Sequence, residues 1–547
     1  MTVQTPAEAT PLLGGGAVHR GGPQGSGHHV NALEVTTAVA IGARRMRRRT
    51  TLLGAQGRVN HAPMGLFGSF VFLSNLITGP GILGLPAAFR FGGFLLGGGL
   101  TLSFGVLSAL SIAFIAHSCR TFRVVGLRAT IPPGAYEHSL NRAPHIELET
   151  LVRGLGINTV WVLFQLVFLC SMSLMAISCI VVTSAGLDSL SMLLLGNAWG
   201  FQVHPRLAWV SSCPAGTADA SCSAQAAFHD VTSSGGLLVS LGYLLTVSIT
   251  LPMSLIDVSD TFQAASYCIS LTFLLQLITK FFLMAYSPSS HGAGAVAGGQ
   301  HPPAVGWNPG LALEVSFWSW CISFAGPMWV EEKDVSTPLV LPMVYAFGHR
   351  VVLDLLLGWS GASAFPHMAP TTLNILQAVA THPACGTLTK ASGIGFVVSS
   401  LASNIVDYAM VASRNLECHV GTTAANLLGI GVPFAVAWAF YGGASFANLV
   451  NAASPLLNGL VQFVVPALMF RAYTRLDADV PPPGGGPSLR LMNMHAYERT
   501  WRWIALLIAC GIAGLIALTY VLNGLVAQGT IHPAGTVSAD YAPAASR

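Results

Sequence analysis

The stretch NLITGPGILGLPAAF at residues 75–89 interrupts a long apolar run with residues that break helices. Three glycines and two prolines fall within eight positions: Gly79, Pro80, Gly81, Gly84 and Pro86. Proline removes a helix hydrogen bond and glycine loosens the backbone, so main-chain N–H and C=O groups are left free. In lipid these groups must be satisfied by protein, an ion or a ligand. The stretch is therefore either a kink healed by neighbouring helices or a binding site made of main-chain groups.

A second apolar run is interrupted at SFAGPMW (323–329), where Gly326 and Pro327 are adjacent. Transporters built from inverted repeats place their site where two helices, one per repeat, are unwound near the membrane midplane. Paired Gly/Pro interruptions are the sequence signal for such a site. With five spans in each repeat, both interruptions fall in the first span of their repeat. The pairing favours a binding site over two unrelated kinks.

The chemistry expected at the first break follows from helix ends. A half-helix ending near Thr78 leaves carbonyls at the negative end of its dipole, and one starting after Pro80 offers free N–H groups. Donors facing acceptors a few Å away suit a zwitterion, and an amino acid fits this arrangement. The predicted substrate-binding residues lie at the two breaks: Thr78, Gly79, Gly81, Ile82, Leu83, Ser323, Phe324 and Ala325.

Composition places these breaks inside a membrane protein. Of 547 residues, 52% are hydrophobic and 8% are charged, against about a quarter charged in soluble proteins. A span needs about 20 apolar residues. That rule predicts eleven spans, at 65–88, 93–118, 157–185, 235–256, 261–285, 311–330, 345–364, 391–411, 425–441, 446–470 and 503–527. The predicted fold is an all-α polytopic membrane protein with two inverted repeats of five helices and one extra C-terminal helix.

Basic residues set the predicted orientation. Of the 25 lysines and arginines, 20 precede the first span or lie in alternate connecting segments, with Lys333 and Arg350 assigned to the 6–7 segment. Cytosolic loops are rich in Lys and Arg, so the N-terminus is predicted in the cytosol and the C-terminus outside. The predicted domains are a disordered cytosolic tail (1–60), a membrane domain (61–527) and a short non-cytosolic tail (528–547).

The ten cysteines show no CxxC motif and no zinc spacing. Cys213 and Cys222 lie in the 199–234 loop, predicted outside the cytosol, where they could form a disulfide. His382 and Cys385 give two candidate metal ligands, too few for a site. Paired carboxylates, HExxH and Ser/His/Asp sets do not stand out in the spans, so neither an enzyme nor a cofactor other than a co-transported ion is expected.

Four segments carry a family resemblance: NLITGPGILGLPAAF (75–89), LPMSLIDVSDTFQAASYCISL (251–271), SFAGPMWVEEKDVSTP (323–338) and NLVNAASPLLNGLVQFVVPALMF (448–470). In this order they resemble the amino acid/auxin permease family, within the larger superfamily that has the LeuT-type inverted-repeat fold. The third segment departs from the family pattern, since it is shorter and Pro327 stands in an unexpected place. The resemblance implies a secondary transporter that moves amino acids with protons or sodium.

The resemblance also indicates where an ion would couple. In sodium-coupled members, carbonyls of span one and polar groups of spans one and eight surround the ion, and Asn75 matches the family's span-one asparagine. Aligning Arg414 with the family's basic residue puts Ile405 where a threonine often lies and Asp407 where a proline is common, a departure from a standard sodium site. The candidate ion-coupling residues are Asn75, Ser400, Ser403, Asn404 and Asp407.

Asp407 has two competing interpretations. An acid within a span is costly and often marks a proton path, so Asp407 could carry the coupled proton. Alternatively, it lies near the cytosolic end of span eight, where it is solvated or paired with Arg414. Asp354 has a simpler account, a local pair with Arg350 four residues earlier on the same helix face.

The leader contains EATPLL (8–13), in which Glu8 precedes Leu12 and Leu13. This spacing resembles the dileucine signal that sorting adaptors bind. Such a signal would direct the protein to an endosomal, lysosomal or vacuolar membrane. The alternative location is the plasma membrane. The same leader allows a third function, an amino-acid sensor whose tail reports binding to a partner. The sequence does not indicate which amino acid binds.

Overall fold

The computed structural model describes most of the membrane domain. The described residues are 64–130, 148–153, 158–211, 228, 236–255, 260–286, 301–334, 336–366, 368, 375–382, 384–441, 453–479 and 498–527. The predicted tails at 1–60 and 528–547, the candidate disulfide of Cys213 and Cys222, and the leader motif at Glu8, Leu12 and Leu13 lie outside them.

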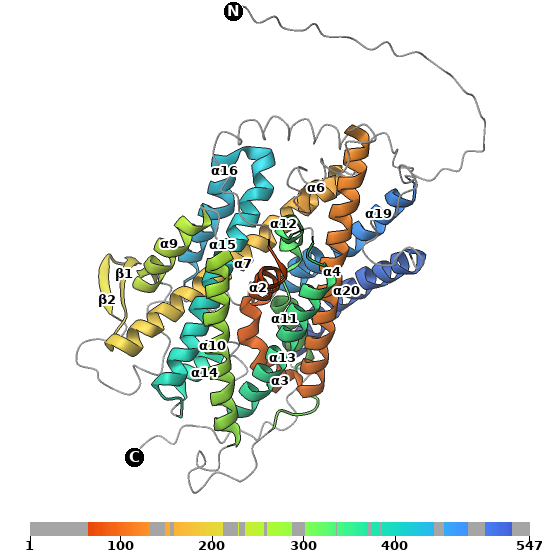
Figure 1. Ribbon diagram of the computed structural model, residues 1–547. Coiled ribbons are helices and arrows are strands. Elements are labelled where there is room, and N and C mark those ends of the chain that lie inside the picture. The colour runs from red at the N-terminus through yellow and green to blue at the C-terminus, as the bar shows by residue number, and fades with distance from the viewer. Residues whose placement is uncertain are drawn as a thin grey trace, which may run out of the picture.

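The chain is a bundle of helices (Figure 1). The first half contains α2 (Leu66–Ile77), η1 (Pro80–Gly84), α3 (Leu85–Gly92), α4 (Phe94–Thr130), α6 (Leu148–Arg153), α7 (Asn158–Leu195), α9 (Leu241–Ser254) and α10 (Asp260–Tyr286). The second half contains α11 (Pro309–Ser319), η3 (Ser323–Ala325), α12 (Gly326–Glu332), α13 (Val340–Ala364), α14 (Ile375–Thr381), α15 (Thr387–Val420), α16 (Thr422–Asn426), η4 (Leu427–Gly431), α17 (Val432–Ala439), η5 (Leu460–Val464), α19 (Val465–Asp479) and α20 (Glu498–Ala527).

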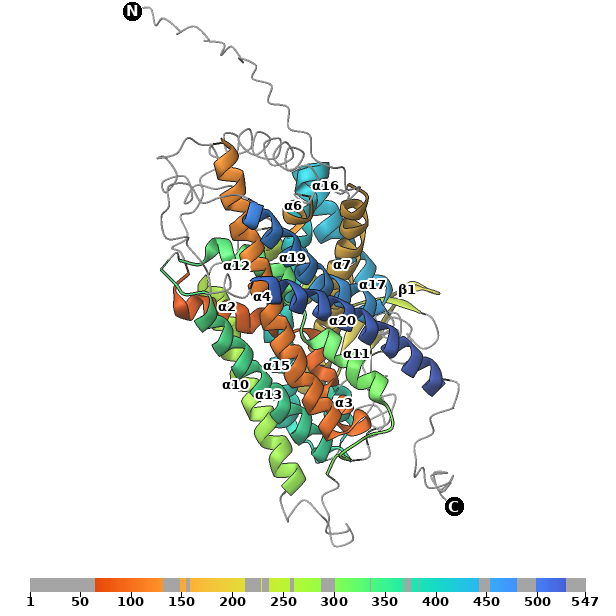
Figure 2. The ribbon, with the colours of Figure 1, turned by 90° about the vertical axis from the view of Figure 1, so that its right-hand side faces the viewer.

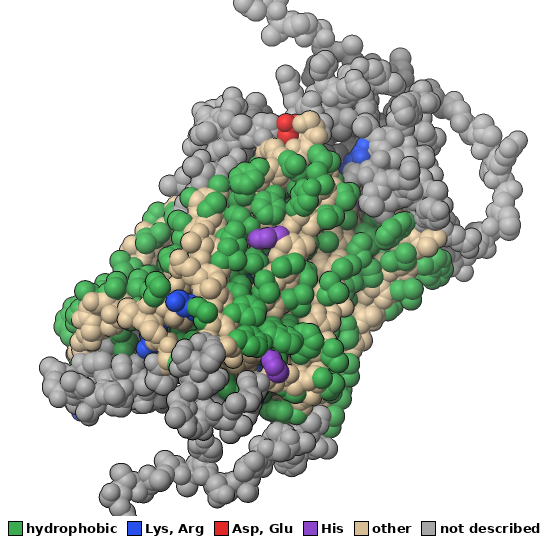
Figure 3. Space-filling view, turned by 60° about the horizontal axis from the view of Figure 1, so that its bottom comes forward, with side chains coloured by type: hydrophobic (Ala, Val, Ile, Leu, Met, Phe, Trp, Pro, Cys, Tyr) green, Lys and Arg blue, Asp and Glu red, His purple; other side chains and the backbone are tan. Residues whose placement is uncertain are grey.

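The helices confirm an all-α polytopic membrane protein. In the described part of the chain, eight helical segments are long and apolar enough to cross a membrane, and the bent pair Leu66–Ile77 and Pro80–Gly92 makes nine. The predicted count of eleven is not confirmed, because α9 has 14 residues and the α11 and α12 segments are short. Figure 3 shows a face covered largely by hydrophobic side chains with few charges, as expected of a surface in lipid.

A small antiparallel sheet adds to the predicted helices at the end of α7. Strands β1 (Trp199–His204), β2 (Ala208–Ser211) and β3 (Leu237–Ser240) pair in the order β2-β1-β3. Buried Asp188 of α7 ties α7 to the start of α9 and to the residues after α17. Its carboxylate accepts hydrogen bonds from the Gly242 N–H (2.8 Å) and from the Tyr441 hydroxyl.

Helix α15 lies inside the bundle and α20 at its edge. Helix α15 packs against α7, α9, α10 and α2, and 78% of its most apolar stretch is buried. Helix α20 packs against α19 and α11 (Figure 2), and only 28% of its most apolar stretch is buried. This is the arrangement expected if α20 is the extra helix outside the two repeats.

The first and sixth spans run antiparallel and are joined at both ends by backbone hydrogen bonds. At one end, the Met64 N–H donates to Glu332 O and the Asp334 N–H donates to Met64 O, both at 2.8 Å. At the other, the Gly306 N–H donates to Gly92 O at 3.0 Å and the Asn308 N–H to Phe91 O at 2.9 Å. The start of each span therefore pairs with the end of the other, as a two-fold relation between inverted repeats requires.

Candidate functional site

Both predicted breaks are present. In the first span, α2 ends at Ile77, Thr78 and Gly79 are non-helical, and the chain resumes at Pro80 with a bend of 55°. In the sixth span, α11 ends at Ser319 and helical structure resumes at Ser323. Proline at the first position of η1 begins the new half-helix without losing a hydrogen bond.

The two breaks touch through their backbones. A Cβ added to Gly81 would lie 2.5 Å from the Ser319 N, and one added to Gly79 would lie 3.3 Å from the Trp318 O. A side chain at Gly81 would collide with main chain that cannot easily move, so glycine permits the close approach. Segments more than 200 residues apart in the sequence thus form one site, with η1 beside the end of α11.

The structure corrects part of the predicted pattern of free main-chain groups. The Ile82 N–H, expected to be free, donates to Gly79 O at 3.3 Å, because the chain resumes as a tight 3-10 turn. The Thr78 carbonyl, expected to face a ligand, accepts a bond of 2.5 Å from the Asn404 side-chain amide. A side chain of α15 therefore occupies the acceptor end of the first break.

The second break is held by Gln462 of η5. The backbone N–H and the hydroxyl of Ser323 both donate to Gln462 Oε1 at 2.6 Å. Phe324 packs its ring against Tyr408, with 5.0 Å between centroids, and the Ala325 N–H donates to Ile322 O at 3.0 Å. Of the predicted residues of span six, Ser323 and Phe324 are therefore held by side chains of spans ten and eight, and Ala325 by its own turn.

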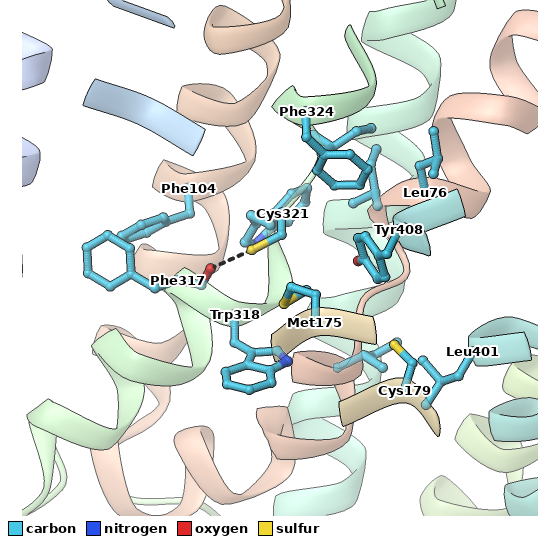
Figure 4. Close-up of a cluster of buried hydrophobic side chains, with 14 of the residues drawn as sticks. Leu76, Phe104, Met175, Cys179, Phe317, Trp318, Cys321, Phe324, Leu401 and Tyr408 are labelled. Carbon is cyan, nitrogen blue, oxygen red and sulfur yellow. Dashed lines mark hydrogen bonds between the residues drawn. The ribbon is translucent and has the colours of Figure 1, made fainter. Parts of the chain in front are cut away.

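Side chains fill the space between the two breaks. Figure 4 shows Met175 and Tyr408 close to Cys321 of the second break, with Phe324 above them and Trp318 below. All of them are buried, and Thr78 at the first break is 7% exposed. The residues at the two breaks are therefore buried in this conformation.

The candidate ion-coupling residues lie on α2 and α15. Ser403 Oγ lies 3.4 Å from Asn75 Oδ1 and donates to Ser400 O at 2.9 Å. Asp407 is one turn beyond Ser403 and 2% exposed, so the interpretation of a solvated acid is wrong. Its Oδ2 has no hydrogen-bond partner, and the charges that act on it are those of Glu332 and Arg414.

The prediction that Arg350 belongs to the cytosolic 6–7 segment is wrong. It lies within α13 and is buried rather than in a cytosolic connection, because its guanidinium is used internally. The local pair with Asp354 is confirmed, with 2.8 Å between Arg350 Nε and Asp354 Oδ1. In addition, Arg350 Nη1 donates to Thr78 Oγ1 at 2.9 Å. The signal that could have found it is an Arg–Asp pair in the middle of an apolar helix, since charges there are rarely without function.

Several buried polar atoms without a hydrogen-bond partner belong to residues of the broken spans and of the helices that pack against them. In the described part of the chain they include Ser74 Oγ, Asn75 Nδ2, Ser319 Oγ, Trp320 Nε1, Arg350 Nη2, Asp354 Oδ2, Ser400 Oγ, Asn404 Oδ1, Asp407 Oδ2, Tyr408 OH and Gln462 Nε2. Nearly all buried polar groups in native proteins are hydrogen-bonded. Unmet donors and acceptors of this kind are where water, an ion or a polar solute can bind.

A separate apolar groove of about 490 Å³ lies between α4 and α13. Its lining includes Val106, His117, Val344 and Trp501, and almost all of the surface is apolar. A charged solute would be poorly satisfied there, so the groove is not a candidate for the same site.

Comparison with family models and with curated proteins finds no match for this chain. Among solved structures, the chain is similar to a manganese transporter from Eremococcus coleocola, crystallised in complex with an aromatic bis-isothiourea substituted compound. The identity is 13%, the match covers 85% of this chain and 97% of that one, and the TM-score is 0.41. A similarity at this level assigns neither a family nor a substrate. The class that fold and site define is a polytopic membrane protein with two interrupted helices in contact.

Proposed function

We propose that the protein is a secondary active transporter of an amino acid that works by alternating access around the two breaks. The observation that carries this proposal is the contact between the two interrupted helices, each of which carries buried polar atoms without a hydrogen-bond partner close to its break (Ser74 and Asn75 on α2, Ser319 on α11). Polar groups at membrane depth are costly unless a polar guest uses them. The resemblance of four segments to the amino acid/auxin permease family supports an amino acid as that guest.

Proton coupling through Asp407 is the favoured mode. Its buried, unpartnered oxygen suits a group that exchanges a proton between two conformations. A sodium ion is the alternative, held by Asn75, Ser400 and Ser403. The amide of Asn404 weakens that alternative, because its N–H group points at the Thr78 carbonyl that a cation would use.

The test is uptake into proteoliposomes from a panel of labelled amino acids, with and without an imposed proton gradient and with and without sodium. We expect a proton gradient to drive accumulation of at least one amino acid, and Asp407→Asn to transport without concentrating it. Uptake that requires sodium and ignores the proton gradient would remove Asp407 from this role and favour Asn75 with the serines.

An amino-acid sensor remains a second candidate because the long leader could report binding to a partner. A pure sensor moves nothing, so exchange of labelled substrate across the membrane separates the two functions.

The location of the protein is tested with Leu12→Ala/Leu13→Ala in the full chain. Loss of endosomal, lysosomal or vacuolar targeting supports adaptor binding at Glu8, Leu12 and Leu13, whereas an unchanged distribution shows that the motif is inert.

A further inference from the structure

One face of α13 runs along the interrupted first span. Arg350 bonds Thr78, a Cβ on Gly358 would lie 2.7 Å from the Phe89 ring, and a Cβ on Gly361 would lie 2.7 Å from Pro86. Residues three and four apart share a helix face. Asp354 lies between Arg350 and Gly358 on that face, so it is level with the η1 segment that follows the break.

The Arg350–Asp354 pair is incompletely satisfied. The side chains are 3% and 0% exposed, and Nε and Oδ1 lie 2.8 Å apart. Neither atom makes an aligned hydrogen bond, and Arg350 Nη2 and Asp354 Oδ2 have no partner at all. A buried ion pair is tolerated well only when further hydrogen bonds satisfy its remaining donors and acceptors. In this pair the unsatisfied donor, Arg350 Nη2, is cationic, and the unsatisfied acceptor, Asp354 Oδ2, is anionic.

We propose that this pair recognises the two charged groups of a free α-amino acid: Arg350 Nη2 donates to the carboxylate, and Asp354 Oδ2 accepts from the ammonium. The inference rests on the proposed function and names the side chains that hold its substrate. The pair and the zwitterion each have zero net charge, so binding buries no net charge. Charge-assisted hydrogen bonds to the carboxylate and the ammonium would satisfy Arg350 Nη2 and Asp354 Oδ2.

This arrangement predicts substrate class. A solute lacking the carboxylate leaves Arg350 unmet, and one lacking the ammonium leaves Asp354 unmet, so amides, esters and N-acylated amino acids should bind weakly. Main-chain groups at the break then position the substrate rather than supply its counter-charges. If the pair were purely structural, replacing Arg350 and Asp354 would not change the preference for free amino acids over their amides, esters and N-acylated forms.

The first test uses purified full-length protein and the amino acid that the wild type binds best. The double variant Arg350→Met/Asp354→Leu is suitable because replacing a buried ion pair with apolar residues of similar volume is often neutral or stabilising. We expect the variant to stay folded, shown by a cooperative thermal transition, and its affinity to be at least about 10-fold weaker, since a hydrogen bond to a charged group is lost at each end. Retained affinity in the folded variant would overturn the inference and leave the proposed function intact.

The second test does not depend on that variant folding. Affinities for the amino acid and for its carboxamide are measured on the wild type and on Arg350→Gln/Asp354→Asn, which keeps an uncharged polar side chain at both positions. We expect the variant to lose about 10-fold or more for the acid and less for the amide, because the acid loses contacts at its carboxylate and its ammonium whereas the amide loses only the ammonium contact. Equal losses for both ligands would indicate a structural pair and overturn the inference.

The matched control is Asp188→Asn, which removes a buried charge whose hydrogen bonds to Gly242 and Tyr441 are satisfied. Its affinity for the amino acid should be unchanged. Failure of the wild type to bind or transport any amino acid would instead count against the proposed function, so the two failures are distinguishable.

Discussion

Arg350 on α13 and Thr78 at the end of α2 are joined by a hydrogen bond of 2.9 Å across 272 residues of sequence. Thr78 Oγ1 in turn donates to Ser74 O at 2.9 Å, and Thr78 O accepts from Asn404. One residue therefore links spans one, seven and eight at the point where the first span is interrupted. The contacts to Arg350 and Asn404 come from other helices and add to the bonds that Thr78 makes within its own helix, to Ser74 O and Asn75 O.

Thr78→Val should destabilise the protein by about 1–3 kcal/mol, because it leaves an Arg350 donor buried without an acceptor. Thermal unfolding in detergent measures this as a lower midpoint. Thr78→Ser keeps the hydroxyl and serves as the control. Equal midpoints for the valine and serine variants would show that the hydroxyl contributes nothing.

Gly81→Ala should abolish transport and lower stability by about 1–3 kcal/mol, because the added methyl group meets the backbone of Ser319. Uptake and the unfolding midpoint are both measured. Gly511→Ala in α20 is the matched control, since nothing lies within 4 Å of a Cβ there. Wild-type uptake by the Gly81→Ala variant would mean that the two breaks do not need to touch.

Gln462→Leu should weaken amino-acid affinity about 10-fold, because Ser323 loses the acceptor for both its N–H and its hydroxyl. The measurement is equilibrium binding of the labelled amino acid. Gln462→Glu retains the acceptor oxygen and should retain more affinity than the leucine variant. The opposite order would exclude this role for Gln462.

A disulfide between Met64→Cys and Lys333→Cys should hold the two broken spans together at one end. Their residues form a β-bridge, and paired Cα atoms in such bridges lie within the range that a disulfide spans. We expect oxidation to stop uptake and a reductant to restore it, with each single-cysteine variant unaffected. Full uptake in the oxidised double variant would show that this contact stays closed throughout transport.

The sequence predicted the breaks well, because glycine and proline act on the backbone where they stand. It also predicted the Arg350–Asp354 pair, which depends on the local spacing of one helix. Most of the helical segments were found for the same reason, since a run of apolar residues is a local signal.

The contacts across the site could not be predicted in this way. Asn404 reaches Thr78 over 326 residues, and Gln462 reaches Ser323 over 139. A free donor or acceptor at a break can be predicted from helix geometry, but its partner depends on which helix packs beside it. Arg350 was assigned to a connection because basic residues were counted by position in the chain, and only packing shows that it faces Thr78.

The most direct measurement is exchange of labelled amino acid across the membrane of proteoliposomes loaded with the unlabelled form, without any ion gradient. The account predicts that the wild type accumulates label by exchange for at least one amino acid, and that Gly81→Ala does not. Absence of exchange for every amino acid in a protein shown to be folded would contradict the proposal of a carrier built around the two breaks.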